Sequence, residues 1–112
     1  MKKIEAIVRE EKFAEVHEAL EAGGYPGMTV THVEGHGRQR GRVEQFRGCE
    51  YKIDLLPKVK IEIIVKDGDA AKIVDLIRQA ALTGEVGDGK IFVLPVETAI
   101  RVRTGESGER AI

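Results

Sequence analysis

The chain has 112 residues, 42% of them hydrophobic, which suits one compact domain over residues 1–112 with a core of its own. Its 18 lysines and arginines nearly balance 19 aspartates and glutamates, which excludes a chain that is basic overall. No apolar run approaches the ~20 residues of a membrane span, the N-terminus lacks a signal-peptide pattern, and a single cysteine excludes an intramolecular disulfide, so we expect a cytoplasmic protein.

The first elements are predicted from their hydrophobic period. Residues 2–9 alternate between apolar and polar, as a half-buried strand does. Residues 12–22 carry apolar side chains at helical spacing and are followed by two glycines and a proline, which predicts that a helix ends there. Residues 27–34 are rich in threonine and valine and predict a second strand.

The next segment, Gly35–Leu56, has no sustained period of either kind. Loops of about twenty residues are rare in compact domains unless they are functional or disordered. Its arginines fit a nucleic-acid loop, but the strand predicted at 58–66 lacks the aromatics that an RNA-binding domain of this topology would stack on bases. The other interpretation is a protein-recognition loop.

The pattern then repeats. Residues 58–66 alternate, residues 70–81 carry a second helical stripe, and residues 91–96 are apolar on both faces, as in a strand covered on both sides. The polar residues 97–112 form a tail. The order strand, helix, strand, strand, helix, strand predicts an α+β fold, the ferredoxin-like βαββαβ sandwich.

Two apolar residues and the two-sided strand at 91–96 favour an oligomer. The helices of this fold cover one face of the sheet, and Ile7 and Ile64 interrupt the polar side of their strands, which belongs to the other face. We therefore expect further copies of the chain to cover that face.

A glycine-rich turn at Thr83–Lys90 is the first candidate site. It contains G-x-x-x-x-G-K, but Ile91 replaces the hydroxyl of a P-loop, and the order of helix and strand is reversed. Closely spaced glycines still let N–H groups converge on phosphate oxygens, and Lys90 adds a positive charge. The simpler interpretation is a tight turn that needs positive φ at Gly87 and Gly89.

Arg101 and Arg103 are the second candidate. Their alternation in IRVR would send both guanidinium groups to one side of an extended chain, where they could clamp a polyphosphate; a solvated tail is the alternative. His32 and His36 are four residues apart, but at a strand-to-loop transition, so we expect no metal there. Because no catalytic constellation is visible, we expect a protein that is not an enzyme, and a nucleotide hydrolase is disfavoured.

Three separated stretches resemble the PII nitrogen-regulatory signal-transduction family. They are RGCEYKIDLLPKVKIEI from Arg47, TGEVGDGKIFVLPVE from Thr83 and IRVRTGESGERAI from Ile100, and GHGRQRG from Gly35 is similar to the start of the family's long loop. The resemblance covers nearly the whole chain in register. It implies a homotrimer with nucleotide clefts between neighbours and a long flexible loop at about 36–56 between strands 2 and 3.

The resemblance also implies the site residues. The positions that it places at ATP or ADP are Ile7, Thr29, Gly35, Gly37, Arg38, Gln39, Ile64, Gly87, Asp88, Gly89, Lys90, Arg101 and Arg103. It places 2-oxoglutarate at Gln39, Lys58 and Gly87, with Gln39 also a ligand of Mg²⁺.

The resemblance implies that two loop residues serve in modification and in partner binding. Tyr51 matches the modifiable tyrosine of the family, and Arg47 matches the residue that relatives insert into the channel of an ammonium transporter. The resemblance thus implies control of nitrogen assimilation by blocking that transporter, which would recruit the protein to the membrane. A uridylyltransferase or a glutamine synthetase pathway enzyme would be further partners. The alternative is a regulator of a nitrogen-assimilation enzyme or adenylyltransferase, and the rival class is an RNA-binding ferredoxin-like domain.

The chain departs from the family pattern at three loop positions. His36 stands where phenylalanine is common, and Arg40 where lysine is common. Cys49 replaces an alanine, or the serine that some relatives phosphorylate, so phosphorylation at that position is excluded.

Overall fold

The computed structural model describes residues 1–36, 43–46, 49–52 and 55–112; of residues 43–46 and 49–52 it describes the backbone. The elements are β1 (Lys2–Arg9), α1 (Phe13–Ala22), β2 (Thr29–Gly35), β3 (Val43–Phe46), β4 (Cys49–Lys52), β5 (Leu56–Val65), α2 (Ala70–Ala81) and β6 (Gly89–Pro95). Short 3₁₀ turns lie at Glu10–Lys12, Asp67–Asp69 and Gly108–Ala111.

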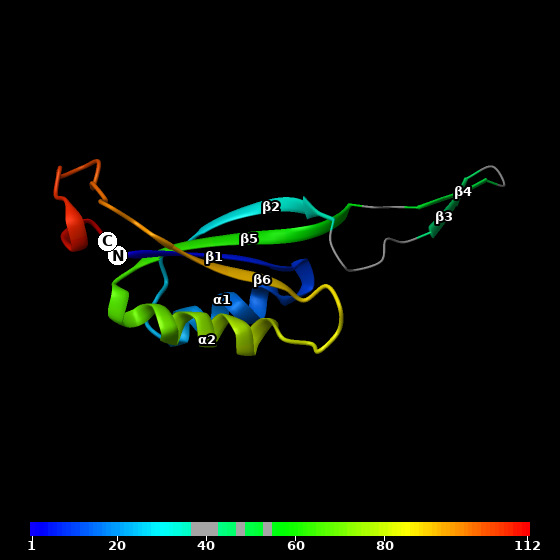
Figure 1. The fold of residues 1–112 in the computed structure, drawn as a ribbon, viewed down its shortest axis with the longest axis horizontal. Helices are drawn as coiled ribbons and strands as arrows, with labels where there is room; N and C mark the ends of the chain where they lie inside the picture. The colour runs from blue at the N-terminus through cyan, green and yellow to red at the C-terminus, as the bar shows by residue number, and fades with distance from the viewer. Residues whose placement is uncertain (37–42, 47–48, 53–54) are drawn as a thin grey trace.

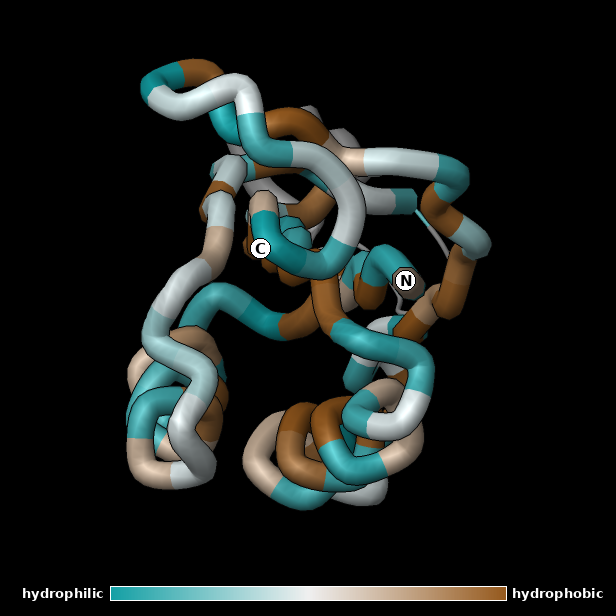
Figure 2. Tube along the Cα trace, turned by 90° about the vertical axis from the view of Figure 1, so that its left-hand side faces the viewer, coloured by the Kyte–Doolittle hydropathy of each residue, from teal (hydrophilic) through white to brown (hydrophobic). Residues whose placement is uncertain are grey.

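The main sheet has the strand order β2-β5-β1-β6, and neighbouring strands are antiparallel. Both helices lie on the same face of this sheet (Figure 1), and the view along the sheet shows them side by side (Figure 2). This arrangement confirms the predicted α+β, ferredoxin-like βαββαβ fold.

The core lies between the helices and the sheet. Even-numbered residues of β1 from Ile4 onward and odd-numbered residues of β5 from Val59 onward point into it, as their alternation predicted. The helices contribute Val16 and Leu20 from α1 and Ile73 and Ile77 from α2, all fully buried. Burial of each such side chain stabilises the fold by about 1.5–3 kcal/mol, which is why these helices stay on this face.

The opposite face of the sheet carries the charged residues of the predicted polar sides of β1 and β5. Cross-strand ion pairs join Lys3 to Glu62 at 2.6 Å and Glu5 to Lys60 at 3.4 Å. Strand β6 is an edge strand, and in the single chain Phe92 is 45% exposed, so the cover predicted for its second side stays a prediction. Apolar side chains therefore lie on the β6 margin of this face, beside a charged centre.

The long connection between β2 and β5 contains a hairpin that the sequence did not reveal. Strands β3 and β4 pair antiparallel, with Val43 opposite Lys52 and Phe46 opposite Cys49, and they project beyond the end of the sheet (Figure 1). Four residues per strand are too few to show a reliable period. The flexibility expected of this segment stays a prediction, because residues 37–42, 47–48 and 53–54 lie outside the described residues.

Candidate functional site

A cavity of about 560 Å³ opens at the end of the sheet where β1 ends and β6 begins. Its lining residues are Ile7, Gly35, His36, Leu56, Lys58, Glu85, Val86, Gly87, Asp88, Gly89, Lys90 and Phe92. Seven predicted site residues thus come together around one cavity, from both ends of the chain: Ile7, Gly35, Lys58, Gly87, Asp88, Gly89 and Lys90.

Glycines shape the turn between α2 and β6 that forms one wall. Gly84, Gly87 and Gly89 have φ values of 88°, 101° and 106°, which confirms the positive φ predicted at Gly87 and Gly89. A Cβ atom on Gly89 would lie 1.8 Å from the carbonyl oxygen of Ile7. Backbone strain and close approach to β1 therefore both require glycine at position 89.

The carboxylate of Asp88 holds the turn together from inside. Its Oδ2 accepts hydrogen bonds from the N–H groups of Thr83 and Gly84, both at 2.9 Å, and its Oδ1 accepts one from the Thr83 hydroxyl. The Thr83 hydroxyl is the main reason that the pKa of Asp88 is held well below its usual range, and the two N–H groups and Arg9 act in the same direction. The side chain of Asp88 is thus bonded within its own turn. The turn therefore offers backbone groups to a ligand, and not this carboxylate.

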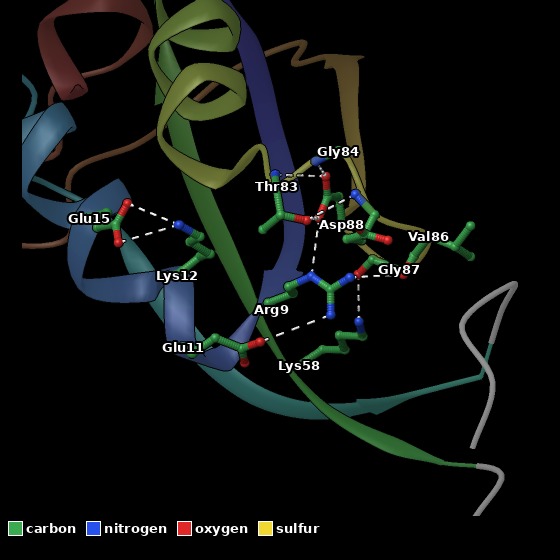
Figure 3. Close-up of polar contacts among 11 residues, drawn as sticks. Arg9, Glu11, Lys12, Glu15, Lys58, Thr83, Gly84, Val86, Gly87 and Asp88 are labelled. Atoms are coloured by element: carbon green, nitrogen blue, oxygen red, sulfur yellow. Dashed lines mark hydrogen bonds and ion pairs between the residues drawn. The ribbon is translucent and has the colours of Figure 1, made fainter. Parts of the chain in front are cut away.

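Arg9 joins this turn to the end of β1 (Figure 3). Its Nε donates to Asp88 Oδ1 at 3.1 Å and its Nη2 donates to the Val86 carbonyl at 2.8 Å. Only 12% of its side chain is exposed. The sequence did not single out Arg9, because it falls on the polar side of an alternating strand and its partners lie 77 and 79 residues away.

Lys58 is the other cation beneath the turn. It falls on the polar side of β5 yet is only 8% exposed, and its Nζ donates to the carbonyl of Gly87 at 2.7 Å. Burial lowers the pKa of Lys58, the charge of Arg9 lowers it further, and the carboxylates of Glu11 and Asp88 act the other way. A Cβ atom on Gly35 would lie 3.2 Å from the Lys58 side chain, so glycine there leaves room for this lysine.

The remaining described site residues lie elsewhere on the chain. Ile64 is opposite Lys3 on β1, whereas Ile7 is opposite Lys60 on β5, which separates the two isoleucines by about 13 Å along the strands. Thr29 lies on β2 opposite Glu62, on the same side as Ile64. A single chain therefore does not bring Ile7 and Ile64 together.

The two candidate arginines also lie far from the cavity. They follow β6, whose length of seven residues puts about 20 Å between the glycine turn and the strand's far end. The predicted extended geometry is wrong, because residues 102–104 form a turn closed by the Ile100–Ser107 bridge. Within that turn Arg101 Nη1 pairs with Glu106 Oε1 at 3.2 Å, while Arg103 is exposed.

Known proteins are similar to this chain over its whole length. A family model described as "Nitrogen regulatory protein P-II" matches residues 1–106. The chain belongs to the P-II family.

Individual relatives agree with the family match. The chain is 56% identical over 112 residues to "Nitrogen regulatory protein P-II 2" of Methanothermobacter thermautotrophicus, covering 100% of this chain and 97% of that protein. It is 57% identical to the P-II protein of Bradyrhizobium diazoefficiens and 54% identical to that of Azospirillum brasilense, with both chains covered completely in each case. The chain is therefore a nitrogen-regulatory signal-transduction protein, as the three sequence motifs indicated.

The structure does not describe the side chains of several predicted P-II site residues. Gly37, Arg38, Gln39 and Arg47 are outside the described residues, and Tyr51 belongs to β4, of which the backbone is described. Across the described part of the chain, no helix is long and apolar enough to cross a membrane. Nor do three or more His, Cys, Asp or Glu side chains of that part gather into a group that could hold a metal ion.

Proposed function

We propose that this P-II protein senses ATP or ADP together with 2-oxoglutarate and passes the result to a partner through residues 36–56. The observation that carries this proposal is the cavity in which a positive-φ glycine turn faces the same space as Lys58 and Lys90. Turns of this kind offer consecutive N–H groups to phosphate oxygens, and lysines add charge. The protein acts in this proposal as a regulator and not as an enzyme.

The division of the site residues supports an assembly of several chains. Ile7, Gly35, Gly87, Gly89 and Lys90 surround the cavity, whereas Thr29, Ile64, Arg101 and Arg103 lie elsewhere on the same chain. The cavity residues and the remaining residues can contact one nucleotide only if a second copy of the chain brings its Thr29, Ile64, Arg101 and Arg103 to the cavity of the first copy. In a closed ring of three chains every cavity is completed in the same way.

We therefore expect the purified protein to be a homotrimer at micromolar concentration. Light scattering should give three times the chain mass of 12.3 kDa. A particle of one chain mass would contradict both the ring and the shared nucleotide cleft.

The positive charges of Lys90 and Arg103 should contribute much of the affinity for ATP, because both are proposed to contact its phosphates. Lys90→Ala and Arg103→Ala are each expected to weaken ATP binding roughly ten- to a hundredfold, the worth of a hydrogen bond to a charged group. Calorimetry would measure this, with Lys66→Ala as the control, since Lys66 is exposed beyond the end of β5. Unchanged affinity in both variants would remove these residues from the site.

The sensing step combines Gln39 with Lys58. Gln39 would supply an amide oxygen to Mg²⁺, a hard cation that prefers oxygen ligands. Lys58, whose Nζ lies 2.7 Å from the Gly87 carbonyl, would supply charge for a carboxylate of 2-oxoglutarate. Because these two residues flank the long connection, a ligand that engages both binds its conformations unequally and shifts their populations.

Calorimetry with ATP–Mg²⁺, with and without 2-oxoglutarate, is the experiment that tests this function. Wild type should bind ATP alone and then 2-oxoglutarate in the presence of ATP–Mg²⁺. The Gln39→Ala variant should largely retain ATP and lose 2-oxoglutarate. Equally tight 2-oxoglutarate binding by the variant would show that Gln39 is not the switch.

The proposed partner is an ammonium transporter, engaged by Arg47 and blocked by the loop. That partner would recruit the otherwise cytoplasmic protein to the membrane, and a uridylyltransferase would act at Tyr51. Control of a glutamine synthetase pathway enzyme, another nitrogen-assimilation enzyme or an adenylyltransferase is the alternative within the family. RNA binding is the rival outside it, and gel shifts with RNA in ATP-free buffer would separate the two.

A further inference from the structure

Two cations from neighbouring strands bind successive carbonyl groups of the glycine turn. Arg9 Nη2, at the end of β1, donates to the Val86 carbonyl at 2.8 Å, and Lys58 Nζ, near the start of β5, donates to the Gly87 carbonyl at 2.7 Å. Arg9 also reaches the next residue, because its Nε donates to Asp88 Oδ1 at 3.1 Å (Figure 3). Three consecutive turn residues are therefore held from the sheet.

These bonds determine where the N–H groups of the turn point. In a planar trans peptide the C=O and the following N–H point in opposite directions. A fixed Val86 carbonyl therefore orients the N–H of Gly87, and a fixed Gly87 carbonyl orients the N–H of Asp88. Because the turn borders the cavity, the orientation of these donors decides how well an anion is bound there.

We propose that Arg9 is a positioning residue that sets the anion-binding shape of the glycine turn from the end of β1. Its planar guanidinium offers donors in several directions at once, so it can hold Val86 and Asp88 together, which a single ammonium on a flexible stem does less well. This inference rests on the proposed nucleotide function. Arg9 acts through the turn rather than by contact with the ligand, since it is not among the residues that line the cavity.

The charges around Arg9 are balanced locally. Asp88 lies on one side, Glu11 approaches Nη1 at 3.9 Å, and Lys58 is the neighbouring cation. Loss of Arg9 would leave the Asp88 carboxylate with the Thr83 and Gly84 donors alone. The turn would then lose its side-chain bonds to β1 while keeping its internal hydrogen bonds.

The test compares Arg9→Met and Arg9→Lys with the control Lys12→Met. Lys12 pairs with the exposed Glu15 at 3.3 Å, on the first turn after β1. Calorimetry should show ATP binding roughly ten- to a hundredfold weaker in Arg9→Met, since displacement of a binding group by about 1 Å has effects of that size. Arg9→Lys should recover part of the loss, and Lys12→Met should match wild type.

A spectroscopic measurement separates positioning from general loss of stability. In nucleotide-free protein, Arg9→Met should shift the amide resonances of residues 83–90 and leave those of α1 and β2 in place. A double-mutant cycle with Asp88→Asn should show effects on ATP binding that are less than additive, because both residues act through one contact.

Three results would overturn the proposal: wild-type ATP affinity in Arg9→Met, unmoved turn amides, or fully additive losses in the cycle. If wild type itself binds no ATP, the proposed function fails instead. The amide shifts of the nucleotide-free variant then still decide whether Arg9 positions the turn.

Discussion

Substitution of Gly89 by alanine is expected to lower the free energy of unfolding by about 3–5 kcal/mol. The new Cβ would lie 1.8 Å from the Ile7 carbonyl oxygen and 2.9 Å from its carbon, and the residue would have to keep a φ of 106°. Neither atom belongs to a side chain that can rotate away, because both are backbone of β1, one of the two inner strands of the sheet. The turn must therefore move, and the proposed ATP binding should be lost with it.

Gly84→Ala is the matched control for this prediction. Gly84 belongs to the same turn and has a φ of 88°, but nothing lies within 4 Å of its Cβ position. It should cost only the backbone strain, about 1–2 kcal/mol. Urea unfolding of both variants would measure the difference, and equal losses would show that the close approach to Ile7 does not matter.

Removal of the Asp88 carboxylate should have the next largest effect. Asp88→Ala leaves the Thr83 and Gly84 N–H groups and the Arg9 guanidinium without their shared acceptor. We expect a loss of about 2–4 kcal/mol at pH 7, because several hydrogen bonds to one charged group disappear together. Urea unfolding would measure it, with Glu106→Ala as the control, since the exposed Arg101–Glu106 pair should contribute only about 0–1 kcal/mol.

The loss in Asp88→Ala should depend on pH in a stated direction. The pKa of Asp88 is lowered in the folded protein, so the carboxylate stabilises the fold fully above the unfolded value of about 3.9. That contribution disappears as the pH falls through the lower folded pKa. Wild type and Asp88→Ala should therefore converge in stability as the pH falls below about 4, and a gap that stays constant would contradict the assignment.

The elements of the fold could be predicted from the sequence because burial repeats with a regular period. Alternation over β1 and β5 and the helical stripes of α1 and α2 identified the buried side of each element correctly. The order of these elements then left few antiparallel arrangements open. The positive φ at Gly87 and Gly89 was predictable for a similar reason, since glycine is the residue that adopts it without strain.

The site was harder to predict because its contacts join distant parts of the chain. Arg9 and Lys58 lie on the polar sides of their strands, where a local pattern predicts exposure, yet the turn around Val86 and Gly87 covers both. At Arg101 the local pattern failed for the backbone. Alternation predicted an extended chain, but backbone hydrogen bonds between Arg101 and Glu106 and between Gly105 and Arg101 close a turn. A pattern of neighbouring residues predicts neither the cover over Arg9 and Lys58 nor the turn at Arg101.

The position of β6 has a consequence for how this protein can change over evolutionary time. The strand carries the glycine turn at one end and the arginine-bearing C-terminal turn beyond the other, and its side chains at Phe92, Val93 and Leu94 are exposed in the single chain. Substitutions along β6 can therefore adjust this exposed surface one residue at a time. Insertions and deletions cannot, because each residue added moves the two ends apart by about 3.4 Å and an odd number also exchanges the faces of the strand. Selection on β6 should accordingly conserve its length more strictly than its side chains.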